Sequence, residues 1–324
     1  MRLLQLRLWQ RTLPRQLQRL KPLVLKLMNE PVDPVSGFVR FKVDFAYDGT
    51  DFNGWAMQPG LRTVQGEFLE ALTVIFGPDE KDFGLRVAGR TDAGVHARHQ
   101  VLHIDLTPVQ LKRLGRHNAP EIRDDKLKGR LNSLLPKDVR IYTLAPAPNG
   151  FDARFSAIHR RYRYRIADKF AVKDPIEARN TLWINKPLNT DDMQTAANQL
   201  LGLNDFAAFC KPRDFSTTIR DLKEITVKRR IDENHVVELE LMADAFCHNM
   251  VRAIVGALIA VGEGRAKPID VKTRLDAANR VGSYKVVGSH GLALIEIGYP
   301  ADELLGIQAS ESRARRTLEE PGQE

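Results

Sequence analysis

The sequence is poor in cysteine: its 324 residues contain only Cys210 and Cys247, which lie far apart and outside any Cys-x-x-Cys motif. So few thiols argue against a disulfide framework and against a cysteine-based zinc knuckle. They also suit a reducing compartment, and we therefore expect a cytoplasmic protein.

Long apolar runs are also missing, and none approaches the roughly 20 residues that a membrane-spanning helix needs. Acidic residues are missing from residues 1–27, whereas seven basic residues occur there, so this segment holds seven of the eight net positive charges. The rest of the chain is nearly neutral, and any nucleic-acid surface on it must be a local basic patch.

The basic N-terminal segment has three interpretations. It is rich in Arg and Leu, as transit peptides are, but it lacks their serines, and its leucines are too often interrupted for a secretory signal. Met28 can be the true start, which would make residues 1–27 dispensable; otherwise they form a targeting arm or an RNA-binding arm. We expect a flexible extension over residues 1–37 and a disordered polar tail over residues 306–324.

Apolar patterns predict a mixed order of strands and helices. Strands are expected at residues 39–45, 85–88, 102–106, 139–144, 161–166 and 292–297. Two further strands are expected, one before and one after residues 232–235. Helices are expected at residues 64–76, 127–135, 193–201 and 250–261. Residues 145–150 are typical of a linker, with similar elements on both sides, so we expect an α+β fold of two domains, 38–150 and 151–305.

The candidate chemistry lies in the stretch Val87–Leu106, where Asp92 occupies a glycine-flanked loop. The spacing from Gly84 to Thr91 approaches that of a phosphate-binding loop. Such a loop needs a strand before its first glycine and a helix after its Thr. Here the apolar strand lies between the glycines and no helix is expected to follow, which excludes this site.

Three histidines in the same stretch raise the possibility of a metal site. His96, His99 and His103 are spaced i, i+3, i+7, with Asp92 and Asp105 nearby. His103 is expected inside a strand and His96 in the turn before it, so the three rings should not share a face. The pattern therefore disfavours a metal centre.

Asp92 itself can belong to a turn or act as a nucleophile. Gly89 and Gly94 allow backbone to approach a ligand on both sides of it. Arg90 lies two positions before it, so an extended backbone would place both side chains on one face. Taken alone, this segment favours a structural turn held by an arginine over a catalytic site.

A distant helix changes that balance. Residues 250–261 are apolar all round except for Arg252, which shares a face with Val255 and Ile259. A guanidinium in such surroundings needs an acceptor, because an unpaired buried charge costs several kcal/mol. Asp92 is a suitable partner, and a structural ion pair with Asp244 is the alternative.

The strand at residues 161–166 has two distinct faces. Tyr162 and Tyr164 lie on one face, and Arg161, Arg163 and Arg165 lie on the other. On their own the tyrosines are typical of a core, although a tyrosine can also stack on an RNA base. The arginine face could hold phosphates.

Several short motifs together resemble the tRNA pseudouridine synthase A family. They occur in the family's order over about residues 38–300, and the stretch Gly89-Arg-Thr-Asp-Ala-Gly-Val-His96 is the most specific. The others are residues 47–49, 54–55, 151–155, 160–164, 201–202, 205–206, 245–246, 250–252 and 254–256. Ala56, His99 and Asp152 depart from the family's usual residues.

The resemblance implies two fused ferredoxin-like halves whose sheets frame a central RNA-binding cleft. It implies an enzyme that isomerises uridines 38, 39 and 40 of the tRNA anticodon arm to pseudouridine, as a homodimer and without a cofactor or metal. Asp92 would be the catalytic aspartate, Arg252 its ion-pair partner and Tyr162 a stacking platform for the target uracil. Arg90 would help to flip the nucleotide out.

Two other classes of function stay open. A non-catalytic RNA-binding protein would keep the basic faces but would not need Asp92 and Arg252, and both are present. A metal-dependent hydrolase would need the histidines to converge around Asp92.

Overall fold

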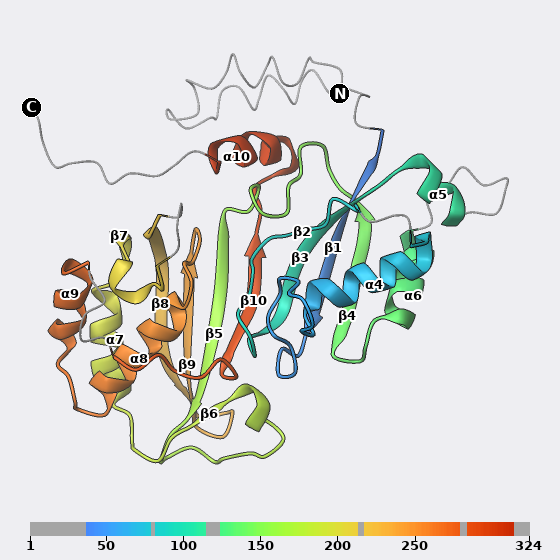
Figure 1. Cartoon of the computed structure of the whole chain (residues 1–324). Coiled ribbons are helices and arrows are strands. Elements are labelled where there is room, and N and C mark those ends of the chain that lie inside the picture. Colours follow the sequence, from blue (N-terminus) through green and yellow to red (C-terminus); the bar gives the residue numbers. More distant parts are fainter. Residues whose placement is uncertain (1–36, 79–81, 115–123, 213–216, 279–283, 314–324) are drawn as a thin grey trace, which may run out of the picture. The chain divides into compact units, whose positions relative to one another are not determined.

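The eight predicted strands and two short strands that were not predicted, Leu182–Trp183 and Gly202–Asp205, join into one ten-stranded sheet, shown in Figure 1. The computed structural model describes residues 37–78, 82–114, 124–212, 217–278 and 284–313. The basic extension lies outside these residues, so its three interpretations stay predictions.

The sheet has the order β4-β1-β3-β10-β5-β9-β8-β7, with β2 paired to β3 and β6 paired to β5. In chain order the strands are β1 (Val39–Tyr47), β2 (Arg86–Val87), β3 (His96–Leu106), β4 (Val139–Pro146), β5 (His159–Ala167), β6 (Leu182–Trp183), β7 (Gly202–Asp205), β8 (Ile219–Arg230), β9 (Val236–Ala243) and β10 (Leu292–Gly298). Neighbouring strands run antiparallel, except that β10 is parallel to β3 and β6 is parallel to β5.

In chain order the helices are α4 (Val64–Phe76), α5 (Pro108–Leu114), α6 (Asp124–Leu134), α7 (Thr190–Asn198), α8 (Met250–Gly262), α9 (Pro268–Asp276) and α10 (Leu305–Glu311). They lie in two groups in Figure 1, α4 to α6 on one side of the β3–β10 junction and α7 to α9 on the other, whereas α10 lies beyond the end of β10. Single turns of 3-10 helix occur at η2 (Ala178–Asn180), η3 (Ala207–Phe209) and η4 (Asp302–Leu304). No helix in the described ranges is long and apolar enough to cross a membrane.

Local chemistry explains where α4 begins and how it packs. The Thr63 hydroxyl accepts a hydrogen bond from the backbone N–H of Gly66 at 3.2 Å, which satisfies a free donor of the first turn. Phe68 then lies 4.9 Å from Phe45 of β1, edge to face, in the apolar layer between helix and sheet. This packing confirms the helix and the strand expected from the sequence.

The α+β class is confirmed, whereas the two ferredoxin-like halves and the domain boundary at residue 150 stay predictions. The sheet passes from β3 to β10 through only two residue pairs, His96 with Ala293 and Ala97 with Leu294. Further along the chain, β3 pairs with β2 at Leu102 and His103. The other edge of β10 pairs with β5.

Two sequence-based expectations about the elements are wrong, and the short elements α5, α9, β6 and β7 were not predicted. His96 does not lie in a turn but opens β3, because its backbone pairs with Ala293 of β10. Helix α5 was not predicted, since it is short and begins at Pro108, whose fixed φ suits a first helical position. The polar tail begins as a helix, because Leu305 and Ile307 of α10 are buried, so disorder is wrong for residues 306–311.

The cysteines, which the sequence analysis left unpaired, form a disulfide between Cys210 and Cys247. Their Cα atoms lie 5.7 Å apart, within the range that a bridge requires. Proximity arises because the backbone N–H of Lys211 donates to the carbonyl of His248 at 2.9 Å, which joins the two loops. Cysteine usage therefore no longer supports a reducing compartment.

His103 leads to a prediction about stability in acid. Its ring is buried on β3, its Nδ1 accepts a hydrogen bond from the Ala153 N–H at 3.0 Å, and burial, assisted by the charge of Arg40, lowers its pKa to about 4. The unfolded chain binds a proton there near pH 6.5, so the free energy of unfolding should fall as the pH drops from 6.5 towards 4. The His103 contribution should be at most about 1.4 kcal/mol per pH unit.

Urea titrations between pH 4 and 8 on the wild type and on His103→Gln measure this dependence. The variant keeps an acceptor for the Ala153 N–H and should show the shallower decline below pH 6.5. Parallel curves for the two proteins would show that His103 does not titrate as described.

Candidate active site

Asp92 lies in the loop between β2 and β3, and the rest of the protein holds this loop at several points. The Trp55 N–H donates to the carbonyl of Thr91 at 3.1 Å, and the Gln100 side-chain amide donates to the carbonyl of Gly89 at 2.7 Å. The hydroxyls of Tyr47 and Thr91 lie 2.7 Å apart, and burial raises the pKa of Tyr47 to about 12, which keeps its hydroxyl protonated. The loop is thus fixed from β1, β3 and the segment before α4.

Close backbone approach explains the glycines at this loop. Gly94 has a φ of +73°, and a Cβ there would come within 2.5 Å of the Ser289 hydroxyl. Gly54 has a φ of +90°, and a Cβ there would lie 2.8 Å from the carbonyl of Thr91. Gly89 is less confined, since the nearest atoms to its Cβ position, on Leu294 and Tyr162, are 4.0 Å away.

Arg252 reaches this loop from α8, as the sequence predicted. It is the one residue of the helix that is not buried, and its Nη1 lies 3.9 Å from Asp92 Oδ2, an ion pair without a hydrogen bond. Its Nε donates to the carbonyl of Val287 at 2.8 Å, and its Nη1 lies 3.3 Å from Asn249 Oδ1. Asp244, the alternative partner, accepts instead from the N–H groups of Asp221 and Ala245.

A glycine on the same helix fixes the segment that orients Arg252. A Cβ on Gly256 would come within 2.1 Å of the carbonyl of Lys285, so only glycine lets residues 284–288 lie against α8. That approach brings the carbonyl of Val287 to the Arg252 guanidinium. The orientation of the Arg252 side chain towards Asp92 therefore depends on the close packing of Gly256 against the backbone of Lys285.

Tyr162 and Arg90 occupy different surroundings near Asp92. Tyr162 is only 7% exposed, its ring meets Phe246 edge to face at 5.0 Å, and burial, with the charge of Asp92, raises its pKa. Arg90 is exposed on the loop, and no carboxylate in the described ranges lies within 4 Å of it. The structure thus places Tyr162 at the base of the site and Arg90 at its surface.

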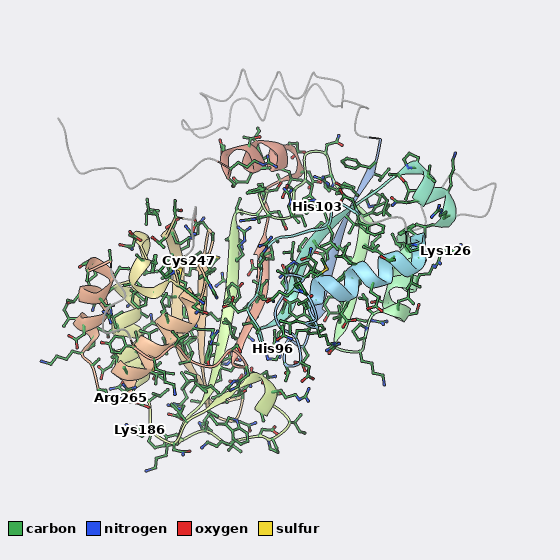
Figure 2. All side chains as sticks on the ribbon, in the orientation of Figure 1. His96, His103, Lys126, Lys186, Cys247 and Arg265 are labelled. Atoms are coloured by element: carbon green, nitrogen blue, oxygen red, sulfur yellow. A yellow bond between two sulfur atoms is a disulfide. The ribbon has the colours of Figure 1, made fainter. Side chains whose placement is uncertain are left out.

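His248 is a neighbour of Asp92 that sequence reasoning missed. Its Nε2 lies 3.5 Å from Asp92 Oδ1, on the other carboxylate oxygen from Arg252. The disulfide of Cys247 lies one residue before it, and Figure 2 shows Cys247 beside the strands of the C-terminal part. Its only sequence signal was its position two residues before Met250, ahead of the helix that carries Arg252.

The histidines of β3 do not converge. Figure 2 shows His96 and His103 towards opposite ends of the strand. The Nδ1 of His96 accepts from the Gly49 N–H at 3.1 Å, and His99 Nε2 lies 3.2 Å from Asp44 Oδ1. Across the described ranges, no group of three or more His, Cys, Asp or Glu residues could hold a metal ion.

The arginine face of β5 is neutralised by glutamates. Arg161 Nη1 lies 2.7 Å from Glu224 Oε2, and Arg163 Nη2 lies 2.6 Å from Glu240 Oε1. Arg165 likewise lies between Glu233 and Glu238. The suggestion that this face holds phosphates therefore finds no support.

A cavity of about 390 Å³ opens on that same face, away from Asp92. Its lining includes His96, Arg98, Arg140 and Arg163 but none of the residues Asp92, Arg90, Arg252 or Tyr162. The convergence of side chains on Asp92, rather than this cavity, therefore defines the candidate site.

Comparison with known proteins gives one consistent result. A sequence profile described as tRNA pseudouridine synthase matches residues 196–300, which include Arg252 and Gly256. The tRNA pseudouridine synthase A of Leifsonia xyli is 49% identical over 284 residues, covering 86% of this chain and 98% of the relative. The protein of the same name from Streptomyces avermitilis is 48% identical, covering 91% of this chain and 99% of the relative. That from Mycobacterium leprae is 42% identical, covering 87% of this chain and 97% of the relative.

The contact at Gly256 can be tested by a small substitution. Gly256→Ala should displace residues 284–288 and lower the free energy of unfolding by about 1–3 kcal/mol. Gly129→Ala on α6 is the matched control, because its added Cβ meets no atom within 4 Å and alanine favours a helix. Urea denaturation of both variants measures the difference, and equal stabilities would contradict the close approach of residue 285 to α8.

Proposed function

This chain belongs to the tRNA pseudouridine synthase family, and on that premise we propose that it isomerises uridines 38, 39 and 40 of the tRNA anticodon arm, with Asp92 as nucleophile and without a cofactor. The relatives support the coarser statement directly: the chain is an RNA pseudouridine synthase that acts on uridine in tRNA.

The convergence of Asp92 and Arg252 carries this proposal. The two residues come from opposite sides of the β3–β10 junction, and Arg252 is the exception on an otherwise buried helix. The hydrogen bonds of its guanidinium to the Val287 carbonyl and to Asn249 hold that charge in a fixed position beside Asp92. Its Nη1 brings positive charge within 3.9 Å of the carboxylate that we propose as the nucleophile.

The isomerisation needs few groups. The bond from N1 of uracil to C1′ of ribose breaks, a bond from C5 to C1′ forms, the proton leaves C5, and N1 gains a proton. No electrons are gained or lost, so no redox cofactor is required. The Asp92 carboxylate can attack uracil C6 or ribose C1′, or it can assist the formation of a glycal. His248, beside Asp92 Oδ1, is placed to receive or return a proton.

Tyr162 and Arg90 would bind the substrate. A uridine must leave its stack to reach Asp92, at a cost of a few kcal/mol that contacts with the protein offset. The exposed Arg90 is placed to hold the vacated space or the backbone beside it. Tyr162 is only 7% exposed and its ring meets Phe246 edge to face, so a base would rest on its remaining exposed edge.

The remaining parts of the proposal concern partners and location. We propose the anticodon stem-loop as the part of tRNA that enters the site, a homodimer as the assembly and the cytoplasm as the location. The resemblance supports all three, and the location now rests on the substrate alone because the cysteines are paired.

Asp92→Asn tests the proposal most directly. The substitution keeps the size of a side chain that is one-third exposed but removes its charge, so folding and tRNA binding should persist. Pseudouridine formation should fall by at least about 10³-fold. Chemical mapping of pseudouridine at single-nucleotide resolution, in an unmodified tRNA with uridine at 38, 39 and 40, measures both the activity and its positions.

Wild-type protein that modifies uridines elsewhere would contradict the positions but not the chemistry. Full activity of Asp92→Asn would contradict the nucleophile, and binding without any product from the wild type would favour a non-catalytic RNA-binding protein.

Metal removal gives a separate prediction. Since His96, His99 and His103 have different partners, a zinc-selective chelator should leave the yield of pseudouridine unchanged. Mg²⁺ is kept constant so that the tRNA stays folded. An activity that is lost and that returns only with added zinc would instead support a metal-dependent enzyme.

A further inference from the structure

Asp152, which departs from the family's usual residue, organises a group of arginines. Its carboxylate is buried, and its Oδ1 accepts from the N–H groups of Arg154 and Phe155 at 2.9 and 3.0 Å. Its Oδ2 lies 2.9 Å from Arg86 Nη1 and 3.4 Å from Arg313 Nη2. One carboxylate therefore fixes a loop and gathers two guanidinium groups from elements far apart in the sequence.

The ring of Phe155 is the centre of this group. The guanidinium carbons of Arg313, Arg154 and Arg86 lie 4.8, 5.2 and 5.7 Å from its centroid. Cation–π contacts of this kind orient a guanidinium and leave N–H groups at its edge free to donate. We call Phe155 and these three arginines the Phe155 cluster.

Positive charge in the Phe155 cluster exceeds the negative charge around it. Asp152 is the one carboxylate within 4 Å of Arg86 or Arg313 in the described residues, and none lies that close to Arg154. Burial, followed by the charges of Arg90 and Arg86, lowers the pKa of Arg154, so these like charges do repel one another. Other arginines of the chain are better matched, such as Arg40, whose Nε and Nη2 each donate to an oxygen of Asp105 at 2.7 Å.

The Phe155 cluster adjoins the loop of Asp92. The buried guanidinium of Arg160 donates from one nitrogen to the carbonyl of Arg154 at 2.6 Å and to the carbonyl of Ala88 at 2.9 Å. Ala88 precedes the glycine-flanked loop, and Arg90 at its surface is among the charges that act on Arg154. A ligand held by the cluster would therefore continue towards Asp92.

We propose that the Phe155 cluster binds backbone phosphates of the RNA strand on one side of the nucleotide that enters the Asp92 site. Guanidinium edges pair well with phosphate oxygens, and a bound phosphate would supply the negative charge that the cluster lacks. Half-exposed side chains at Arg86 and Arg313 make their edges accessible. This inference rests on the proposed function for the identity of the RNA, but the binding itself can be measured without catalysis.

The test compares salt-dependent binding of the full-length variants Arg86→Gln, Arg154→Gln and Arg313→Gln to an unmodified tRNA. Each substitution should weaken binding by about tenfold at low salt. Each should also reduce the slope of log K against log salt by about 1, the signature of a lost phosphate contact. Arg140→Gln, at an exposed arginine of β4 that lines the cavity beside β5, should change neither quantity.

Phe155→Leu separates orientation from charge. It keeps every positive charge but removes the ring that aligns the guanidinium groups, so affinity should fall while the salt slope stays near that of the wild type. The melting temperature of each variant is measured as a control for folding. The three arginines come from β2, from the loop before β5 and from the residues just after α10. A folding defect in one variant therefore leaves two independent tests.

Unchanged salt slopes in the folded arginine variants would overturn the proposal. Weakened binding by the variants together with an inactive wild type would uphold the cluster and reject the proposed catalytic function, so the two failures are distinguishable.

Discussion

The short parallel pairing between β3 and β10 is the constraint on which the candidate site depends. β3 begins at His96, directly after the loop of Asp92, and β10 follows the segment that contains Val287 and Ser289. Val287 holds Arg252, and Ser289 lies against Gly94. Two residue pairs of backbone contact therefore set the distance between a carboxylate and a guanidinium that are otherwise attached to separate parts of the sheet.

The charges of the protein divide into two kinds. On β5, Arg161 and Arg163 are matched by glutamates on β8 and β9, so that face gains little attraction for an anion despite its many arginines. Around Phe155, Arg86 and Arg313 share the single carboxylate of Asp152, and the charges of Arg90 and Arg86 also act on Arg154. A local imbalance, rather than the net charge of the chain, is what a phosphate backbone would experience.

Sequence patterns predicted those elements whose apolar residues repeat clearly. The alternation in β1 and the helical spacing in α4 reflect burial on one face, which a single segment already encodes. Helix α10 and the Cys210–Cys247 bridge were missed for the opposite reason: each depends on a surface that another part of the chain supplies. His248 was missed likewise, because nothing in its neighbourhood indicated that Asp92 lies beside it.

The sequence by itself determined the types of element, the glycine-flanked loop of Asp92 and the single charge on α8, because backbone preferences and apolar periodicity act over a few residues. It also pointed to Asp92 as the partner of Arg252, since a buried charge requires one. Only the tertiary structure decided that His248 adjoins the same carboxylate and that Asp152 gathers Arg86 and Arg313. Those contacts join residues from distant segments, and distances of a few ångströms between them arise only when the whole sheet has formed.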